Sequence, residues 1–214
     1  MSDPNGERRS ALISDLRAAG VGGAQVLGAM VRVPRHRFVP ELLRPRAYEN
    51  CALPVGEGQT ISQPLVVAIM TESLRLTGME KVLEIGTGTG YQAAVLAELS
   101  REVHTVERSE VLYAAAQERL ARLGYRNVTC YLGDGTRGLP EEAPFDAICV
   151  TAGTPAIPEP LAEQLAGGGR LVLPVGGRKR QALRRLTAAS GGQVVEDVSD
   201  VVFVPLIGEF GWPQ

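Results

Sequence analysis

Three glycines between a predicted strand and a predicted helix constrain the fold of this chain more than any other feature. The apolar run Lys81–Ile85 predicts a strand, Tyr91–Leu99 predicts a helix, and Gly86, Gly88 and Gly90 lie between them. Glycine lets the backbone turn tightly, and the N–H groups of the helix start can then approach a ligand closely. The spacing G-x-G-x-G is neither the dinucleotide pattern G-x-G-x-x-G nor a P-loop, because no Gly-Lys-Ser/Thr follows. The segment therefore predicts a ligand-binding turn, with a purely structural strand–helix turn as the alternative.

Strands and helices alternate from residue 65 onward, which indicates βαβ units. We expect an α/β fold with a doubly wound, mostly parallel Rossmann-like sheet and helices on both faces. The expected strands are Lys81–Ile85, Glu102–Val106, Val128–Leu132, Phe145–Thr151, Arg170–Val175, Ala182–Thr187 and Val201–Leu206. The expected helices are Leu65–Leu76, Tyr91–Leu99, a helix capped by Ser109 that ends near Gly124, and Ile157–Ala166.

The first 64 residues do not show this alternation of strands and helices. Residues 8–30 predict two short helices joined by a glycine turn, and residues 44–64 are rich in proline and glycine and predict irregular chain. Long ordered loops are uncommon unless they serve a function. We therefore divide the chain into a small helical and loop extension, residues 1–64, that covers part of the site, and a single compact unit, residues 65–214.

Charge, hydropathy and cysteine content exclude several classes of protein. The chain of 214 residues has 22 basic and 24 acidic residues, so it lacks the basic excess of a general nucleic-acid binder. Apolar runs such as Leu65–Met70 are far shorter than the ~18–20 residues of a membrane span, and the start shows no signal peptide. Cys51, Cys130 and Cys149 are widely spaced, which predicts reduced thiols in a cytoplasmic protein and neither a metal site nor a disulfide framework.

Acidic residues follow the second and third predicted strands. Glu107 ends the second strand, where a carboxylate can accept hydrogen bonds from both hydroxyls of a ribose. Asp134 lies between Gly133 and Gly135 after the third strand and could accept a hydrogen bond from an adenine amino group. Either residue could instead be a solvated strand end or part of a turn. Together with the glycine turn they line one edge of the sheet and indicate an adenosine-bearing cofactor, for which S-adenosylmethionine fits better than NAD.

These residues resemble a known family. Leu83–Gln92 is similar to motif I of the S-adenosylmethionine-dependent methyltransferases, and the chain more narrowly resembles protein-L-isoaspartate O-methyltransferases over about residues 30–210. The most diagnostic segment is Gln59–Pro64, which general methyltransferases lack. Thr89 stands where the family usually has Ser, and Glu57 where it often has His. The other matching stretches are Val33–Pro40, Ala52–Gly58, Val103–Arg108, Phe145–Ile148, Gly168–Gly176 and Phe203–Ile207.

The resemblance implies a set of site residues and an activity. It implies transfer of a methyl group from S-adenosyl-L-methionine to the free carboxyl of L-isoaspartyl (or D-aspartyl) residues in damaged proteins. Ser62 would be the catalytic residue and would orient the substrate carboxylate, although it could also cap the helix near Pro64. The implied substrate-binding residues are Ser62, Val204, Pro205 and Leu206, in a segment that would pair its backbone with the peptide. The implied cofactor-binding residues are Thr60, Ile61, Glu84, Gly86, Thr87, Gly88, Gly90, Tyr91, Glu107, Arg108, Gly133, Asp134 and Gly135.

The implied reaction needs no general base, because a carboxylate is already ionised at neutral pH. This agrees with a sequence that shows no His–Asp or Cys–His arrangement, and we expect structural or solvated roles for His36 and His104. The basic run Arg178–Arg180 predicts a solvated edge, so we expect no nucleic-acid or membrane partner, and we expect a monomer. Two alternatives stay open: a methyltransferase for a small molecule or RNA, and a non-catalytic cofactor-binding module.

Overall fold

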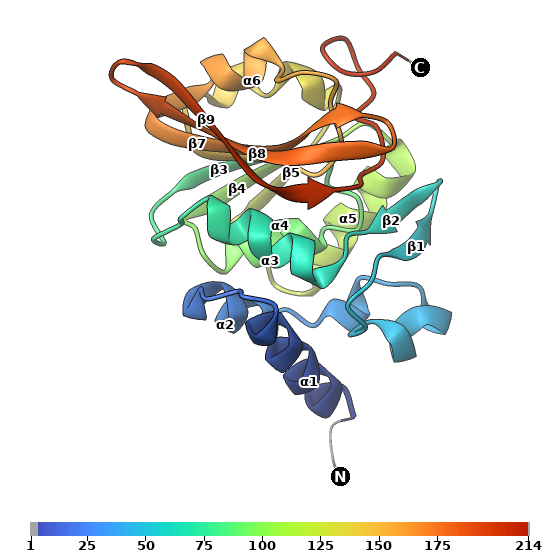
Figure 1. The fold of residues 1–214 in the computed structure, drawn as a ribbon. Helices are drawn as coiled ribbons and strands as arrows, with labels where there is room; N and C mark the ends of the chain where they lie inside the picture. The colour runs from blue at the N-terminus through green and yellow to red at the C-terminus, as the bar shows by residue number, and fades with distance from the viewer. Residues whose placement is uncertain (1–3, 214) are drawn as a thin grey trace.

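A seven-stranded sheet forms the centre of the computed structural model, which describes residues 4–213 (Figure 1). The expectation about the very start of the chain therefore lies partly outside the described residues. The strand order is β5-β4-β3-β6-β7-β8-β9; the first five strands run parallel, and β8 and β9 are antiparallel to their neighbours. The strands are β3 Lys81–Ile85, β4 Glu102–Glu107, β5 Val128–Leu132, β6 Phe145–Val150, β7 Leu165–Gly177, β8 Arg180–Ala189 and β9 Gly192–Val201. This architecture confirms the predicted fold class.

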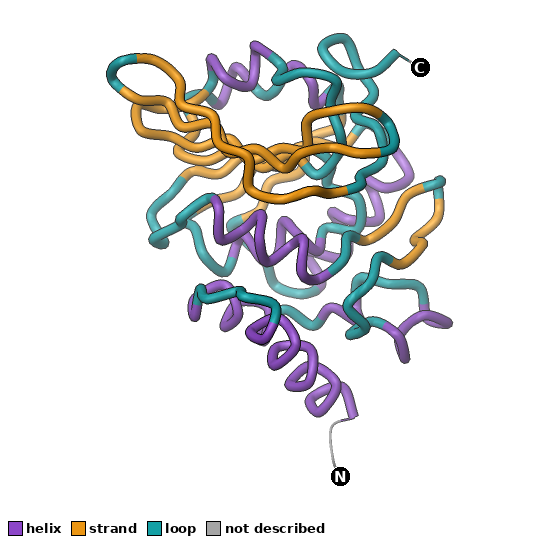
Figure 2. The backbone as a smooth tube through the Cα atoms, in the orientation of Figure 1, coloured by secondary structure: helices purple, strands orange, loops and turns teal. Residues whose placement is uncertain are grey.

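Helices cover both faces of the sheet. Successive side chains of the central strands point to opposite sides of the sheet, so they pack into two different cores. Val82 of β3 packs into one core with the helices α3, α4 and α5 and with the N-terminal helices, and Leu83 of β3 packs into a second core with α6. Figure 2 shows the sheet as one layer with helices on either side. The helices are α1 Pro4–Ala18, α2 Ala24–Arg32, α3 Pro64–Ser73, α4 Tyr91–Ala97, α5 Glu110–Arg122 and α6 Glu159–Glu163.

The N-terminal segment packs directly on the rest of the chain. Leu16 of α1 and Met30 of α2 belong to the same buried cluster as Val67 of α3 and Val95 of α4. The two short helices joined by a glycine turn are found as predicted, with the turn at Gly20 (φ +96°). The stretch predicted as irregular instead contains a two-stranded hairpin, β1 Leu53–Gly56 and β2 Gln59–Ile61, which reaches over the edge of the large sheet (Figure 1).

The last predicted strand and the last predicted helix differ from the structure. Residues 202–206 do not form a strand; β9 ends at Val201, and within residues 202–206 Pro205 makes a single bridge, to Gly153. The helix predicted over Ile157–Ala166 is only α6, because Leu165 already pairs with Phe145 in the sheet. α3 also ends earlier than predicted, at Ser73, shortly before Arg75 turns into the left-handed region (φ +52°).

Candidate active site

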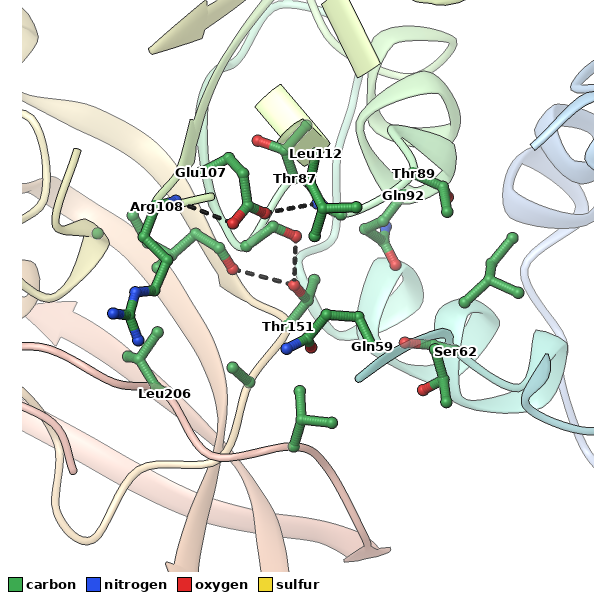
Figure 3. A pocket seen from close by; sticks show the side chains of 18 of the residues that line it. Gln59, Ser62, Thr87, Thr89, Gln92, Glu107, Arg108, Leu112, Thr151 and Leu206 are labelled. Atoms are coloured by element: carbon green, nitrogen blue, oxygen red, sulfur yellow. Dashed lines mark hydrogen bonds between the residues drawn. The ribbon is translucent and has the colours of Figure 1, made fainter. Parts of the chain in front are cut away.

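A cavity opens at the carboxyl edge of β3, β4 and β6, where the glycine turn, the β1–β2 hairpin and the C-terminal segment meet (Figure 3). This is the edge at which doubly wound sheets bind ligands. Of the predicted residues, the cavity is lined by Thr60, Ile61, Ser62, Gly86, Thr87, Gly88, Tyr91, Glu107, Arg108, Gly135, Val204, Pro205 and Leu206. Residues outside the predicted set of site residues complete the lining: Gln59, Val67, Ile85, Thr89, Gln92, Val106, Leu112, Thr151, Ala152 and Ile207.

Thr151, the residue that follows β6, holds the glycine turn in place. Its hydroxyl donates to the carbonyl oxygens of Ile85 (3.0 Å) and Gly86 (2.7 Å), as Figure 3 shows. Gly86 has φ +96°, and a Cβ there would lie 2.5 Å from the Thr151 hydroxyl oxygen. Position 86 therefore requires glycine for its backbone conformation and for the close approach of Thr151.

Glu107 is fixed at the end of β4 by three backbone donors. Its carboxylate accepts hydrogen bonds from the N–H groups of Gly88 (2.9 Å), Arg108 (2.9 Å) and Ser109 (3.0 Å), and the residue is 7% exposed. A carboxylate has about four acceptor sites, so about one stays available toward the cavity that Glu107 lines. The backbone bonds hold this acceptor in place before any ligand arrives.

Ser62 lies where the first cavity meets a second cavity of about 540 Å³. Its hydroxyl makes no hydrogen bond to any described residue, so it is free to donate to a ligand. Ser62 is not the cap of α3: the N-cap residue is Gln63, and Asn50 supplies the capping acceptor for the N–H of Leu65 at 3.0 Å. The helix-cap alternative for Ser62 is therefore wrong.

A buried arginine that sequence analysis did not select holds the backbone at Ser62. Arg35 is fully buried; its Nη2 donates to the carbonyl oxygen of Ser62 and its Nε to that of Ala47, both at 2.8 Å. The guanidinium carbon lies 4.7 Å from the ring centroid of Tyr91, at the start of α4. Burial lowers the pKa of Arg35, and its contact with Tyr91 opposes that shift. The only sequence signal for this role is the position of Arg35 in the proline-flanked segment Val33–Pro40.

Four predicted cofactor residues do not line the cavity. Glu84 is fully buried inside the sheet, and Gly90 packs against Leu120 of α5. Gly133 also lies outside the lining, and the Asp134 carboxylate is engaged within the chain. It accepts hydrogen bonds from the Thr136 N–H (2.9 Å) and hydroxyl (2.7 Å) and from the Glu209 N–H (2.9 Å), so it holds the C-terminal segment. These four residues thus lie outside the cavity wall, and their predicted contacts with the cofactor stay predictions.

Gln92 is the most informative lining residue that the sequence did not reveal. It lies on α4 and is 7% exposed; its amide nitrogen donates to the Thr71 hydroxyl at 3.0 Å, while its Oε1 is buried without a partner among the described residues. An unpaired buried acceptor is costly, so an oxygen of this kind on a cavity wall indicates a site for a ligand donor. The available signal was its place one residue after the glycine turn and Tyr91.

The second cavity runs outward from Ser62 between α3 and the end of β9. It shares Thr60, Ser62, Thr151 and Val204 with the first cavity and continues to Lys179. Along its C-terminal wall, the carbonyl oxygen of Val204 accepts from the Gly153 N–H at 2.8 Å, whereas the Val204 N–H makes no bond within residues 4–213. Part of this backbone is thus open to a further chain.

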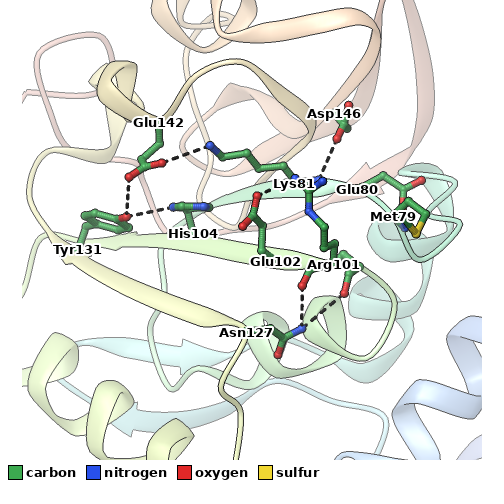
Figure 4. A network of polar contacts seen from close by, with 11 residues as sticks. Met79, Glu80, Lys81, Arg101, Glu102, His104, Asn127, Tyr131, Glu142 and Asp146 are labelled. Atoms are coloured by element: carbon green, nitrogen blue, oxygen red, sulfur yellow. Dashed lines mark hydrogen bonds and ion pairs between the residues drawn. The ribbon is translucent and has the colours of Figure 1, made fainter.

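The two histidines lie away from the cavity. His104 lies near the amino end of β4, where its Nδ1 is 3.0 Å from the Tyr131 hydroxyl in a polar network that also contains Glu142 and Lys81 (Figure 4). Burial lowers the pKa of His104. His36 contacts the Tyr48 hydroxyl at 2.8 Å in the N-terminal segment. Within the described residues there is no cluster of His, Cys, Asp or Glu that could hold a metal ion, and no helix is long and apolar enough to cross a membrane.

Comparisons with known proteins agree with this geometry. Residues 7–211 match the family model described as Protein-L-isoaspartate(D-aspartate) O-methyltransferase (PCMT). The chain is 51% identical to the protein-L-isoaspartate O-methyltransferase of Methanoculleus marisnigri over 212 residues, 99% of this chain and 96% of that protein. It is 53% identical to the enzyme of the same name from Roseiflexus castenholzii, over 98% of this chain and 96% of that one.

Two solved structures have the same fold over nearly the whole chain. One is a protein-L-isoaspartate O-methyltransferase with TM-score 0.84 and 32% identity, covering 95% of this chain and 67% of that one. The other is a Plasmodium falciparum protein of the same description in complex with S-adenosyl-L-homocysteine, with TM-score 0.80 and 25% identity, covering 92% and 97%. The matches confirm the resemblance seen in the motifs. This chain therefore belongs to the protein-L-isoaspartate(D-aspartate) O-methyltransferase family.

Proposed function

We propose that this chain is an enzyme that transfers a methyl group from S-adenosyl-L-methionine to the free carboxylate of L-isoaspartyl or D-aspartyl residues in damaged proteins. The observation that carries the proposal is the hydroxyl of Ser62, which has no partner among the described residues and lies at the junction of two cavities, one of which has groups suited to adenosine. The family match over residues 7–211 supports the activity and the cofactor.

The residues of the first cavity fit S-adenosylmethionine. Glu107 offers a fixed acceptor for ribose hydroxyls, and Gln92 offers an N–H donor an oxygen that has no partner among the described residues. Apolar side chains supply the walls that a purine ring needs, among them Ile85, Leu112 and Leu206. When bound, the cofactor supplies a methyl group on a positively charged sulfur. Thr60 and Ile61 of β2 would shape the wall beside it, and Arg108 would close the ribose end.

The reaction requires the protein to position the substrate carboxylate and does not require the protein to transfer a proton. A substrate carboxylate, with a reference pKa of ~3–4, is ionised at neutral pH and is itself the nucleophile. Ser62 would donate a hydrogen bond to one carboxylate oxygen and leave the other aligned for attack. The segment at Val204, Pro205 and Leu206 would hold the peptide backbone, with the free Val204 N–H as one donor. The two cavities meet at Ser62, and the peptide would exclude water there.

We expect Glu107→Ala to weaken binding of S-adenosyl-L-homocysteine about 10- to 150-fold, because a hydrogen bond to a charged acceptor contributes roughly 1.5–3 kcal/mol. Isothermal titration calorimetry measures this directly. Glu110→Ala is the matched control, since Glu110 is exposed at the start of α5 and does not line the cavity. Equal affinity in the two folded variants would contradict the ribose role of Glu107.

One assay tests the proposed activity. Labelled methyl transfer is measured for an isoaspartyl peptide and for its normal aspartyl twin, in the presence of a chelator. We expect methylation of the first peptide alone, because the normal residue presents its carboxylate on a backbone of different length and misplaces the oxygen. Methylation of both peptides to the same extent would overturn the proposal. Loss of turnover on chelation, with recovery on adding a divalent ion, would overturn the metal-free mechanism.

Further proposals concern the location, oligomeric state and partners of the protein and the division of its chain. We propose that the protein acts as a cytoplasmic monomer without a nucleic-acid or membrane partner. The division into an extension, residues 1–64, and a methyltransferase unit, residues 65–214, is a functional one: the β1–β2 hairpin and Ser62 cover the site, while α1 and α2 share the core of the sheet. Arg184 and Arg185 near the basic run are paired with Asp197 and Glu196, which supports a solvated edge.

A further inference from the structure

Glu84 is a fully buried carboxyl group that the proposed reaction does not use. It lies one residue before the carboxyl end of β3, between Thr105 of β4 and Cys149 of β6, and its side chain has no access to solvent. Oε2 is hydrogen-bonded to the Thr105 hydroxyl, whereas Oε1 is buried without a partner among the described residues. An ionised carboxylate with one bare oxygen is very unfavourable in such a place, and a protonated carboxyl is far less so.

A chain of hydroxyl groups connects this carboxyl to the proposed cofactor cavity. Thr105 Oγ1 bonds Glu84 on one side and lies 2.6 Å from Thr87 Oγ1 on the other. Thr87 belongs to the glycine turn and lines the cavity near Glu107 (Figure 3), and its hydroxyl has no second partner within residues 4–213. Each hydroxyl has a single proton, so the direction of donation at one end of this chain sets the direction at the other end.

We propose that Glu84 is a positioning residue for the cofactor: in its protonated form it donates to Thr105, Thr105 donates to Thr87, and the hydroxyl of Thr87 is thereby directed to donate into the cavity. The inference rests on the proposed cofactor site. The donor at Thr87 would bond an oxygen of the bound cofactor. When Glu84 is ionised the chain reverses, because Thr105 and Thr87 then donate toward the carboxylate, and the cavity receives only lone pairs from Thr87.

The titratable groups that interact with Glu84 are the Glu107 carboxylate and the thiols of Cys130 and Cys149. Burial and, to a smaller extent, the nearby Glu107 carboxylate raise the pKa of Glu84 to about 8, although the hydrogen bond from Thr105 opposes the shift. The two thiols on this face titrate higher, since burial raises the pKa of Cys130 to about 11 and that of Cys149 well above its usual value. Glu84 is thus protonated at neutral pH and loses its proton in mildly alkaline solution.

The test is calorimetric titration with S-adenosyl-L-homocysteine at pH 7 and pH 9. This probe has no sulfonium charge, so direct attraction to an ionised Glu84 does not enter. If the ionised form lacks only the donor at Thr87, whose loss weakens binding about 2- to 13-fold, the dissociation constant should rise about two- to sixfold between these pH values. In Glu84→Gln the amide can still donate to Thr105 but cannot ionise, so the ratio of the dissociation constants at the two pH values should be smaller than in the wild type by this about two- to sixfold factor.

Two further measurements test the inference without relying on Glu84→Gln alone. Thr87→Val should weaken binding at pH 7 about 2- to 13-fold, the range for one neutral hydrogen bond, and should also lose the alkaline effect. Infrared spectroscopy of the wild type at pH 7 should show a buried carboxylic-acid band that shifts in Thr105→Val.

The possible failures can be told apart. The same pH ratio in wild type and Glu84→Gln, or the absence of the acid band, would overturn this inference while leaving the cofactor site intact. Failure of the wild type to bind S-adenosyl-L-homocysteine at pH 7 would overturn both.

Discussion

Arg35→Ala should lower the free energy of unfolding by roughly 3–5 kcal/mol, the range expected when a large, fully buried side chain is truncated to alanine. The substitution empties the space of a fully buried side chain and leaves the carbonyl oxygens of Ala47 and Ser62 without their donor. It also removes the cation that lies over the Tyr91 ring. Urea denaturation followed by circular dichroism measures the loss.

Arg37→Ala is the matched control, because Arg37 belongs to the same short helical turn but is exposed, and its side chain makes no hydrogen bond or ion pair among the described residues. Its effect should stay within about 0.5 kcal/mol. Arg35→Lys should be intermediate, since an ammonium group lacks the planar fork that reaches both carbonyls. If Arg35→Ala and Arg37→Ala cost the same, the buried bonds of Arg35 contribute nothing to stability.

Ser62→Ala is expected to lower turnover on an isoaspartyl peptide by about 10- to 1,000-fold, the scale of losing one positioning group worth about 1.4–4 kcal/mol in the transition state. The expectation follows from the free hydroxyl at the junction of the two cavities. Cofactor affinity should change far less, because Glu107 and Gln92 are untouched. Steady-state kinetics with a labelled methyl donor and calorimetry with S-adenosyl-L-homocysteine separate the two effects.

Ser62→Thr keeps a hydroxyl at this position and should recover part of the lost turnover. The backbone bond from Arg35 to the carbonyl of residue 62 is retained in both variants, so their folding should be unaffected. Full activity of the alanine variant would remove Ser62 from the mechanism and leave substrate orientation to the backbone of the C-terminal segment.

The central parallel strands were predictable because they are buried on both faces, and β3 has the predicted bounds. β5 also has the predicted bounds, although it lies at the edge of the sheet and is only partly buried. β9 was not predictable from hydropathy. It is exposed, and its acidic residues, which are typical of a loop, form cross-strand ion pairs: Glu196 with Arg185, Asp197 with Arg184 and Asp200 with Arg180. Such pairs become visible only when the partner strand is known.

Some residues of the site could likewise be predicted from the sequence, and others could not. The glycine turn and Glu107 were predictable, because the carboxyl ends of neighbouring parallel strands meet at one edge. Gln92 and Arg35 were not, since their importance comes from buried neighbours that are distant in sequence, Thr71 for one and Ser62 for the other. Asp134 has the expected position, but the C-terminal segment, whose path the sequence did not predict, takes up its carboxylate.

The position of Ser62 at the inner end of a groove of about 540 Å³ has a consequence for the proteins to be repaired. A damaged residue can reach this depth only if several residues on each side of it leave their own helix or sheet. Local opening of a folded protein costs anything from almost nothing at a frayed terminus to its full stability in the core. Repair should therefore be fast in loops and tails, and in rigid regions its rate should follow the opening equilibrium of the client protein rather than the chemistry of the enzyme.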